Sequence, residues 1–148
     1  NKEMVYINTI IKNEIDKLDV DIKNKGANVT LKLCKEAELF IDKREFTKVI
    51  ENLLTNAIKF TNGDKRIVIK TYVKDEYFYY EVYNSGGIIK ESDMENIFNS
   101  YYKDKSTRNK KGTGLGLTIV KVVVDLHNGE CFVKNTSDGV KFTIKIKK

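Results

Sequence analysis

The chain has 148 residues, a formal net charge of +6 at pH 7, 41% hydrophobic residues and neither tryptophan nor proline. This length suffices for one domain with its own core, and no run approaches the roughly 20 apolar residues that a membrane-spanning helix requires. The lysines are spread along the chain without an arginine-rich arm, so we expect a soluble lysine-rich surface and no nucleic-acid partner.

The first predicted element is a long amphipathic helix. Isoleucine and leucine recur at three- and four-residue steps over 4–24, and Gly26 is expected to end this helix. Residues 28–34 alternate between apolar and polar side chains and predict a strand. Cys34 and Cys131 lie far apart without a Cys-x-x-Cys motif, so we expect two reduced thiols in or beside strands, in a cytosolic setting.

The strongest periodic signal predicts a helix over 42–64, with Asp42 as its N-cap and Gly63 as its stop. Two strands are predicted next, over 66–73 and 77–83, and the short charged turn between them predicts a hairpin. The chain therefore passes from a helix directly into an antiparallel strand pair.

From residue 84 onward the regular pattern breaks up. A turn is predicted over 84–87, a short helix over 91–98, and a polar, charged loop over 101–111. A loop of this length inside a compact domain is usually functional or mobile.

A glycine-rich stretch then leads into a helix that ends near His127, the only histidine, and two strands over 130–135 and 140–148 close the chain. A helix C-terminus favours a structural, partly cationic imidazole. The order α-β-α-β-β-loop-α-β-β predicts one α/β (α+β) two-layer sandwich over residues 1–148. We expect about three helices on one face of a mixed, mostly antiparallel sheet of about five strands.

One side of the helix over 42–64 carries a polar stripe. Asn52, Asn56 and Lys59 follow one another at spacings of four and three, away from the apolar side. A solvated helix face is the ordinary explanation, but asparagine is a mediocre helix former in mid-helix. Amide oxygens can ligate Mg²⁺, which prefers oxygen ligands, and lysine can neutralise phosphate. The stripe therefore suits a metal–phosphate site.

Three alternate glycines, Gly112, Gly114 and Gly116, stand directly before a stiff, β-branched helix. The chain has no P-loop motif, and these glycines follow a charged loop instead of the strand that a dinucleotide fingerprint requires. The remaining interpretation is a glycine hinge at a helix N-terminus, where unpaired N–H groups and the helix dipole favour phosphate.

Four blocks stand in order along the chain: NLLTNAIKFT (52–61), NSGGII (84–89), IFNSYYK (97–103) and GTGLGLTIVK (112–121). They resemble the N, G1, F and G2 boxes of the ATP-binding domain of sensor histidine kinases, a family that belongs to a wider group with DNA gyrase B and MutL. The resemblance covers essentially the whole chain. It implies the Bergerat-type fold, binding of ATP with Mg²⁺, and a long flexible ATP lid whose base Phe98 packs.

The resemblance also implies roles for individual residues. Asn56 would ligate Mg²⁺, with Asn52 beside the metal and Lys59 on a phosphate, and these three would form the catalytic set. Asn84 would bind the adenine amino group, and Gly86 would let the base lie against its loop. The further nucleotide contacts would be Ile89, Tyr102, Lys103, Gly112, Thr113, Gly114, Leu115, Gly116 and Leu117.

The G1-like box departs from the family pattern. Asn84 stands where the family usually has aspartate, so it can accept from the adenine amine only without charge assistance. Gly87 and Ile88 replace a more usual Pro-Gly pair, and a β-branched Ile88 cannot easily take a positive φ. An alternative alignment with a one-residue gap uses Gly87 as the second glycine of the box. We expect ATP binding of modest affinity.

The function implied by the resemblance is transfer of the γ-phosphoryl group of ATP to a histidine on the kinase's own helical dimerisation domain, in two-component signalling. The implied partners are that domain and a downstream response regulator. Since His127 is expected at a helix end, the phosphoacceptor is expected outside this chain. We expect the chain to be a monomeric cytoplasmic domain of a membrane-anchored homodimeric parent.

Two alternatives remain open. A degenerate ATP-binding signalling domain without turnover is suggested by Asn84 and Ile88. An anti-sigma-factor serine kinase of the same fold would normally carry a glutamate where this chain has Asn52. Gyrase-type ATPases place a glutamate general base there as well, so we expect slow ATP hydrolysis at most.

Overall fold

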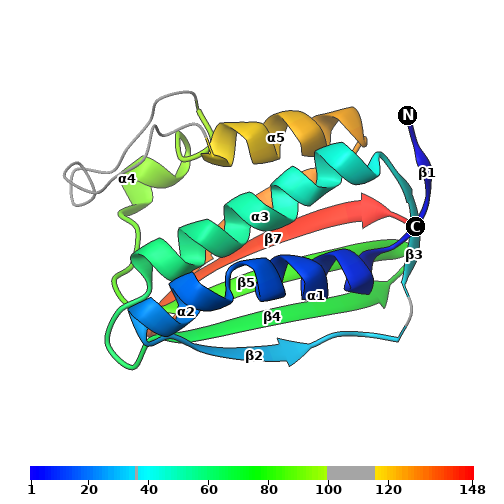
Figure 1. The fold of residues 1–148 in the computed structure, drawn as a ribbon. Helices are drawn as coiled ribbons and strands as arrows, with labels where there is room; N and C mark the ends of the chain where they lie inside the picture. Colours follow the sequence, from blue (N-terminus) through cyan, green and yellow to red (C-terminus); the bar gives the residue numbers. More distant parts are fainter. Residues whose placement is uncertain (36, 100–115) are drawn as a thin grey trace.

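The structure is a computed structural model that describes residues 1–35, 37–99 and 116–148. Its elements, in chain order, are β1 (Glu3–Tyr6), α1 (Ile7–Lys17), α2 (Asp19–Lys25), β2 (Asn28–Lys32), β3 (Glu38–Ile41), α3 (Lys43–Phe60), β4 (Arg66–Lys74), β5 (Tyr77–Ser85), α4 (Glu91–Met94), α5 (Gly116–Leu126), β6 (Glu130–Asn135) and β7 (Gly139–Lys147). Figure 1 shows their arrangement.

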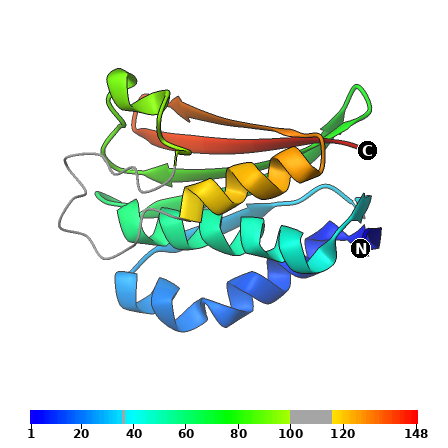
Figure 2. The same cartoon turned by 90° about the horizontal axis from the view of Figure 1, so that it is seen from above.

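The core lies between one sheet and one layer of helices. The strands β2, β4, β5, β7 and β6 form a five-stranded sheet in that order, in which β2 is parallel to β4 and all other neighbours are antiparallel. Helices α1, α2, α3 and α5 cover one face of this sheet, whereas no helix of the described residues covers the other face (Figure 1, Figure 2). The predicted two-layer sandwich with a mixed, mostly antiparallel sheet is confirmed.

Helix α3 lies in the middle of the helical layer (Figure 1). Its start is capped by Asp42, whose Oδ1 accepts a hydrogen bond from the Glu45 N–H at 3.0 Å, as the sequence predicted. Its buried residues recur at helical spacing and are Phe46, Val49, Ile50, Leu53, Leu54 and Ala57. The helix ends at Phe60, before the predicted end at residue 64, because Thr61 takes an extended conformation.

The predicted helix over 4–24 is wrong at its start and in its middle. Glu3–Tyr6 form β1, which pairs antiparallel with β3, a strand that the sequence analysis does not predict. The helix begins at Ile7 and breaks at Leu18, which has φ −96° and ψ 9°, so that α1 and α2 are two helices. Gly26 ends α2 in the left-handed conformation, as expected. Pairing between distant short strands leaves no local signal, so helical periodicity alone extends too far.

A buried histidine joins α5 to the start of α3. His127 accepts a hydrogen bond at Nε2 from the Asp42 N–H (3.0 Å), and its Nδ1 lies 2.8 Å from the Val123 carbonyl oxygen. Both ring nitrogens therefore have hydrogen-bond partners, with Nε2 as an acceptor and Nδ1 placed to donate. The ring also meets Phe46 edge-on, with centroids 5.5 Å apart. His127 is a structural helix-end residue, as expected.

Both cysteines are free thiols, Cys131 within β6 and Cys34 just after β2, as the sequence predicted. Burial raises the pKa of the Cys131 thiol to about 11, because apolar surroundings disfavour the thiolate. None of the helices formed by the described residues is long and apolar enough to cross a membrane.

Candidate functional site

The polar stripe of α3 lies next to the first turn of α5. Asn52 donates from Nδ2 to the Lys48 carbonyl oxygen at 2.7 Å, and its Oδ1 is directed toward Gly116. A Cβ built on Gly116 would lie 3.1 Å from that oxygen, so the close approach of the two helices depends on a residue without a side chain. The structure thus brings together two predicted site residues from opposite halves of the chain.

Asn56 and Lys59 continue the stripe toward the C-terminal end of α3. Both residues are half-buried, and the Lys59 Nζ lies 5.3 Å from the centroid of the Phe60 ring. The side-chain amide of Asn56 makes no hydrogen bond within the described part of the chain. Asn52, Asn56 and Lys59 therefore form one continuous polar edge of α3.

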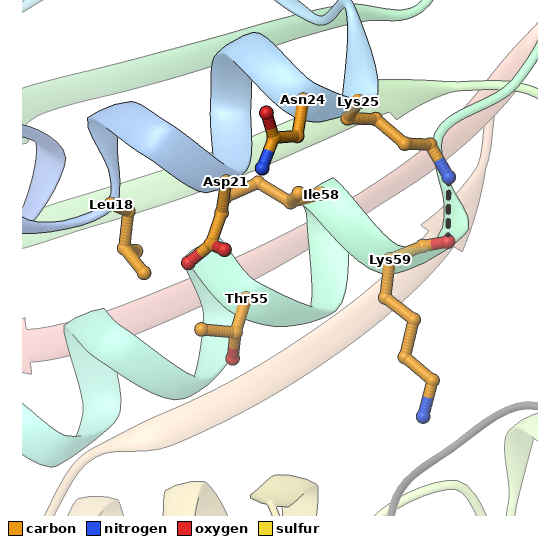
Figure 3. Close-up of a pocket in the computed structure, with 7 residues that line it drawn as sticks. All are labelled: Leu18, Asp21, Asn24, Lys25, Thr55, Ile58 and Lys59. Carbon is orange, nitrogen blue, oxygen red and sulfur yellow. Dashed lines mark hydrogen bonds between the residues drawn. The ribbon is translucent and has the colours of Figure 1, made fainter.

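A groove of about 400 Å³ separates α2 from α3. Its lining residues are Leu18, Asp21, Asn24, Lys25, Thr55, Ile58 and Lys59. The Lys25 ammonium donates to the Lys59 carbonyl oxygen at 3.0 Å, while the Lys59 side chain extends away from α2 (Figure 3). The groove therefore borders the predicted site at Lys59 but does not contain the contact between Asn52 and Gly116.

Asn84 and Ser85 are the last residues of β5, and the turn predicted over 84–87 is wrong there. Asn84 is in register with Ile67 of β4 and Val140 of β7, and only 3% of its surface is exposed. Its Nδ2 donates to the Ser85 carbonyl oxygen at 3.3 Å. Strand pairing on both sides outweighs the local turn preference of asparagine, serine and glycine.

Two glycines let the chain pass closely around this end of β5. A Cβ on Gly139 would overlap the Asn84 carbonyl oxygen. Gly86 has a φ of 133°, and a Cβ there would lie 3.0 Å from the Asn62 backbone nitrogen. The contact of Gly86 with adenine stays a prediction, and the structure adds that glycine is required here for packing against the end of α3. Gly139, at the start of β7, is a further residue that shapes this site.

Two buried hydroxyl residues that the sequence analysis misses join α3 to β5. The Thr61 hydroxyl donates to the Ser85 carbonyl oxygen at 3.1 Å, and the Ser85 hydroxyl donates to the Asn62 carbonyl oxygen at 3.1 Å. Both residues are at most 3% exposed. These bonds hold the C-terminal end of the polar stripe next to Asn84. The position of Thr61 at the end of the NLLTNAIKFT block is its one sequence signal.

Ile89 is held by a side chain of β6. The Asn135 Oδ1 accepts from the Ile89 N–H at 2.9 Å, and its Nδ2 donates to the Ile89 carbonyl oxygen at 2.7 Å. A side-chain amide therefore takes the place of a strand partner. Ile88 is 59% exposed, and neither Gly87 nor Ile88 has a positive φ, so the expected conflict between Ile88 and a positive φ does not arise.

The start of α5 packs onto the segment that follows α4. The Thr118 hydroxyl donates to the Phe98 carbonyl oxygen at 3.2 Å, and the Phe98 ring meets Phe142 edge-on with centroids 6.0 Å apart. Leu117 is half-buried and packs against the core. The prediction that Phe98 is a packing residue is confirmed.

Several predicted site residues lie outside the described part of the chain. They are Tyr102, Lys103, Gly112, Thr113, Gly114 and Leu115, and the predicted loop over 101–111 lies there as well. Within the described part, α3 contributes the polar stripe and α5 contributes Gly116. The end of β5 contributes Asn84, and the segment that follows it contributes Gly86.

The side chains of this site are amides and an ammonium group. No group of three histidine, cysteine, aspartate or glutamate side chains that could hold a metal ion occurs among the described residues. A cation beside Asn52 and Asn56 would need further oxygen ligands from water and an anionic ligand. Mg²⁺ that arrives with a polyphosphate has those ligands, so the residues present fit a metal that enters with a nucleotide.

Comparison with known proteins agrees with this chemistry. A model of the family described as histidine kinase-, DNA gyrase B-, and HSP90-like ATPase matches residues 41–148. The chain belongs to this family. The resemblance to the ATP-binding domain of sensor histidine kinases is confirmed.

The relatives of this ATPase-family domain include two bacterial sensor proteins. Sensor histidine kinase SpaK of Bacillus subtilis is 34% identical over 128 residues, which are 83% of this chain and 28% of SpaK. Sensor protein SrrB of Staphylococcus aureus is 29% identical over the whole chain, which covers 26% of SrrB. The chain thus spans little more than a quarter of the length of these relatives.

Solved structures of histidine kinases share the fold of this domain. The catalytic domain of histidine kinase ThkA, in a nucleotide-free form, matches the whole chain with a TM-score of 0.91 at 25% identity, over 96% of the ThkA domain. ThkA in complex with the response regulator protein TrrA matches 99% of this chain and 42% of that chain, with a TM-score of 0.85 at 25% identity.

Proposed function

We propose that this domain binds ATP with Mg²⁺ and donates the γ-phosphoryl group to a histidine on a helical dimerisation domain of the same parent protein, in two-component signalling. The observation that carries the proposal is the contact between Asn52 of α3 and Gly116 of α5. Asn52 offers an amide oxygen suited to a metal, and the first turn of α5 offers N–H groups suited to phosphate, which supports the proposal. Membership of an ATP-binding family supplies the ligand class.

In this proposal α3 supplies side chains and α5 supplies backbone. Asn56 and Asn52 hold the metal with its water, and Lys59 neutralises a phosphate as a point charge. The N–H groups in the first turn of α5 bind phosphate oxygens, aided by the helix dipole. Phosphoryl transfer requires an in-line acceptor and neutralised charge more than covalent help from the protein, and these groups meet the second requirement.

Asn84 is proposed to recognise the adenine end of the nucleotide. It is buried at the end of β5, directly before Gly86. Its neutral amide accepts from the adenine amine without the charge that roughly doubles such a bond, so we expect modest affinity. The Thr61 and Ser85 hydrogen bonds keep Asn84 in a fixed position relative to α3.

The phosphoacceptor is proposed to lie outside this chain. His127 is the only histidine, and its two ring nitrogens both make hydrogen bonds inside the core. It could attack a phosphoryl group only after losing its link to Asp42. The acceptor would therefore come from another part of a longer parent protein.

We propose that this parent is a membrane-anchored homodimer with the ATP-binding domain on its cytoplasmic side, and that a response regulator receives the phosphoryl group. Support comes from SpaK and SrrB, which are named as sensor proteins, and from ThkA, which is seen with a response regulator. The isolated domain is proposed to be a monomer.

Calorimetric titration with a non-hydrolysable ATP analogue tests the first part of the proposal. We expect binding in the presence of Mg²⁺ and weaker binding after the metal is chelated, because the amide stripe then lacks its link to the phosphates. Lys12→Ala, on the exposed side of α1, is a control that should bind like the wild type. Absence of heat up to millimolar analogue would overturn the proposal.

Phosphoryl transfer is tested with the full-length parent protein and γ-labelled ATP. We expect acid-labile, base-stable label on a histidine outside residues 1–148. ATP binding without any label would instead support a degenerate ATP-binding domain. Label on a serine of a partner protein would support a serine kinase of the anti-sigma-factor type.

A further inference from the structure

The face of the five-stranded sheet that points away from the helices, called the outer sheet face, carries more lysines than carboxylates. Side chains alternate along a strand; on β5, Tyr80 and Val82 are buried under the helices, so Tyr79 and Glu81 face outward. No helix of the described residues covers this face (Figure 2). Its lysines come from four strands and include Lys32, Lys70, Lys134, Lys141, Lys145 and Lys147.

Two pairs of these lysines stand directly opposite one another on neighbouring strands. Lys32 is in register with Lys70, and Lys134 is in register with Lys141. Like charges in directly opposed positions destabilise a sheet. Glu81, in register with Lys70 on its other side and near Lys141, offsets part of this repulsion, but it is one carboxylate against four lysines.

The carboxylates on the outer sheet face do not balance the lysines. Glu81 accepts a hydrogen bond from the Tyr72 hydroxyl at 2.8 Å and lies 4.0 Å from the Lys141 Nζ. Glu130 stands opposite Lys145. These are the acidic residues that the five strands present on this face, so lysine remains in excess.

The tyrosine rings of this face are already in contact with one another and with lysine. Tyr72 and Tyr79 stack with centroids 4.7 Å apart and an interplanar angle of 9°. The Lys145 Nζ lies 4.3 Å from the Tyr77 centroid, and the Lys70 Nζ lies 5.3 Å from that of Tyr72. Because neighbours occupy their faces, these rings are poor platforms for the base stacking that single-stranded nucleic acids require.

We propose that the outer sheet face docks on the surface of an anionic lipid bilayer. Lysine is a compact charge on a flexible stem, suited to anionic charge that is spread over a surface rather than fixed in one pattern. Tyrosine is enriched at lipid–water interfaces. Arg66, the arginine of these strands, is bound by Asp64 and Asp138 at 2.6 Å each, so the docking charge is lysine.

Co-sedimentation of the 148-residue chain with vesicles tests this docking. One set of vesicles is pure phosphatidylcholine, and the other is an equal mixture of phosphatidylcholine and phosphatidylglycerol. We expect binding to the anionic vesicles alone, and release as rising salt screens the charges. Lys70→Gln with Lys134→Gln should weaken this binding by about fivefold per lysine.

A matched variant separates the outer sheet face from net charge. Lys12→Gln with Lys43→Gln removes the same two charges from exposed sites on the helical side and should bind anionic vesicles like the wild type. Both variants should bind Mg²⁺ and the ATP analogue unchanged, so a failure here leaves the nucleotide proposal intact.

Three outcomes would overturn the docking proposal. The first is no binding to anionic vesicles at low salt. The second is equal loss in the two double variants, which would mean that net charge and not this face is responsible. The third is tighter binding to a single-stranded oligonucleotide than to the vesicles, which would make nucleic acid the partner.

Discussion

Gly116→Ala should weaken nucleotide binding with little change in the stability of the fold. A Cβ at residue 116 would lie 3.1 Å from the Asn52 Oδ1, so one of the two groups must move by a few tenths of an ångström. Asn52 is restrained by its 2.7 Å hydrogen bond to the Lys48 carbonyl oxygen. Whichever group yields, the displacement falls where metal and phosphate are proposed to bind.

The expected effects of Gly116→Ala on stability and on binding differ in size. Alanine in place of glycine stabilises the middle of a helix by about 0.5–1 kcal/mol, and at Gly116, the first residue of α5, the gain is at most of this size. That gain offsets the local crowding, so the free energy of unfolding should change by less than about 1 kcal/mol. A lost hydrogen bond to a charged group costs about 1.5–3 kcal/mol, which corresponds to an affinity for Mg²⁺ and ATP analogue about tenfold to a hundredfold lower.

Calorimetry and urea denaturation measure the two effects on the same samples. A double-mutant cycle with Asn52→Ala then tests the cause, because truncation of Asn52 removes the group that the new methyl meets. The double variant should bind no more weakly than Asn52→Ala alone. Additive losses, or wild-type affinity in Gly116→Ala, would refute the reasoning.

Four further changes test the site and its supports. Asn56→Ala should weaken binding of the ATP analogue about tenfold with Mg²⁺ and leave metal-free binding unchanged, as titrations with and without the metal would show. His127→Ala should lower the free energy of unfolding by about 2–4 kcal/mol in urea denaturation, since the Asp42 N–H loses its acceptor and a cavity opens beside Phe46; an unchanged midpoint would contradict this role. Alkylation of Cys131, followed by mass spectrometry, should be slow at neutral pH and should accelerate as the pH approaches the raised pKa of this thiol, about 11. An alkylation rate equal to that of free cysteine would count against the burial of Cys131. The pKa of Asp138 is lowered, first by the Tyr83 hydroxyl and then by Arg66. The contribution of Asp138 to stability is therefore present above its unfolded pKa and is lost as the pH falls through the lowered value. Asp138→Asn should reduce the loss of stability in acid, and an unaltered pH dependence of unfolding would argue against the bonds of Asp138 to Tyr83 and Arg66.

The helical layer shows which parts of the fold the sequence predicts well. The start and buried face of α3 follow from Asp42 and a regular apolar period, which are local properties of one segment. The pairing of β1 with β3 depends instead on contact between short strands far apart in the chain. Helical periodicity therefore extends wrongly over Met4–Tyr6, and Leu18 gives no residue-type signal of its break.

The residues of the candidate site likewise fall into those with a local sequence signal and those whose role depends on contacts between distant segments. Asn52, Asn56 and Lys59 share a stripe that helical geometry makes visible in the sequence. Ser85 acts through its hydroxyl and its carbonyl oxygen, which bond the segment after α3, and Gly139 acts through its close approach to the Asn84 backbone; their residue types only suggest a turn. The residues that recognise a ligand could thus be proposed from sequence blocks, whereas those that hold the two ends of the site together required the fold.

The bond between His127 and Asp42 has a mechanical consequence for α5. Burial along this helix is uneven: Val120, Val123 and Val124 are fully buried near His127, whereas Gly116, Leu117 and Thr118 are half-exposed at the other end. The helix is thus buried most deeply near His127 and least deeply at the turn that is proposed to bind phosphate. Over about 16 Å of helix, a tilt of about 4° about the His127 end would displace Gly116 by about 1 Å, so the packing of His127 sets the position of the turn that is proposed to bind phosphate.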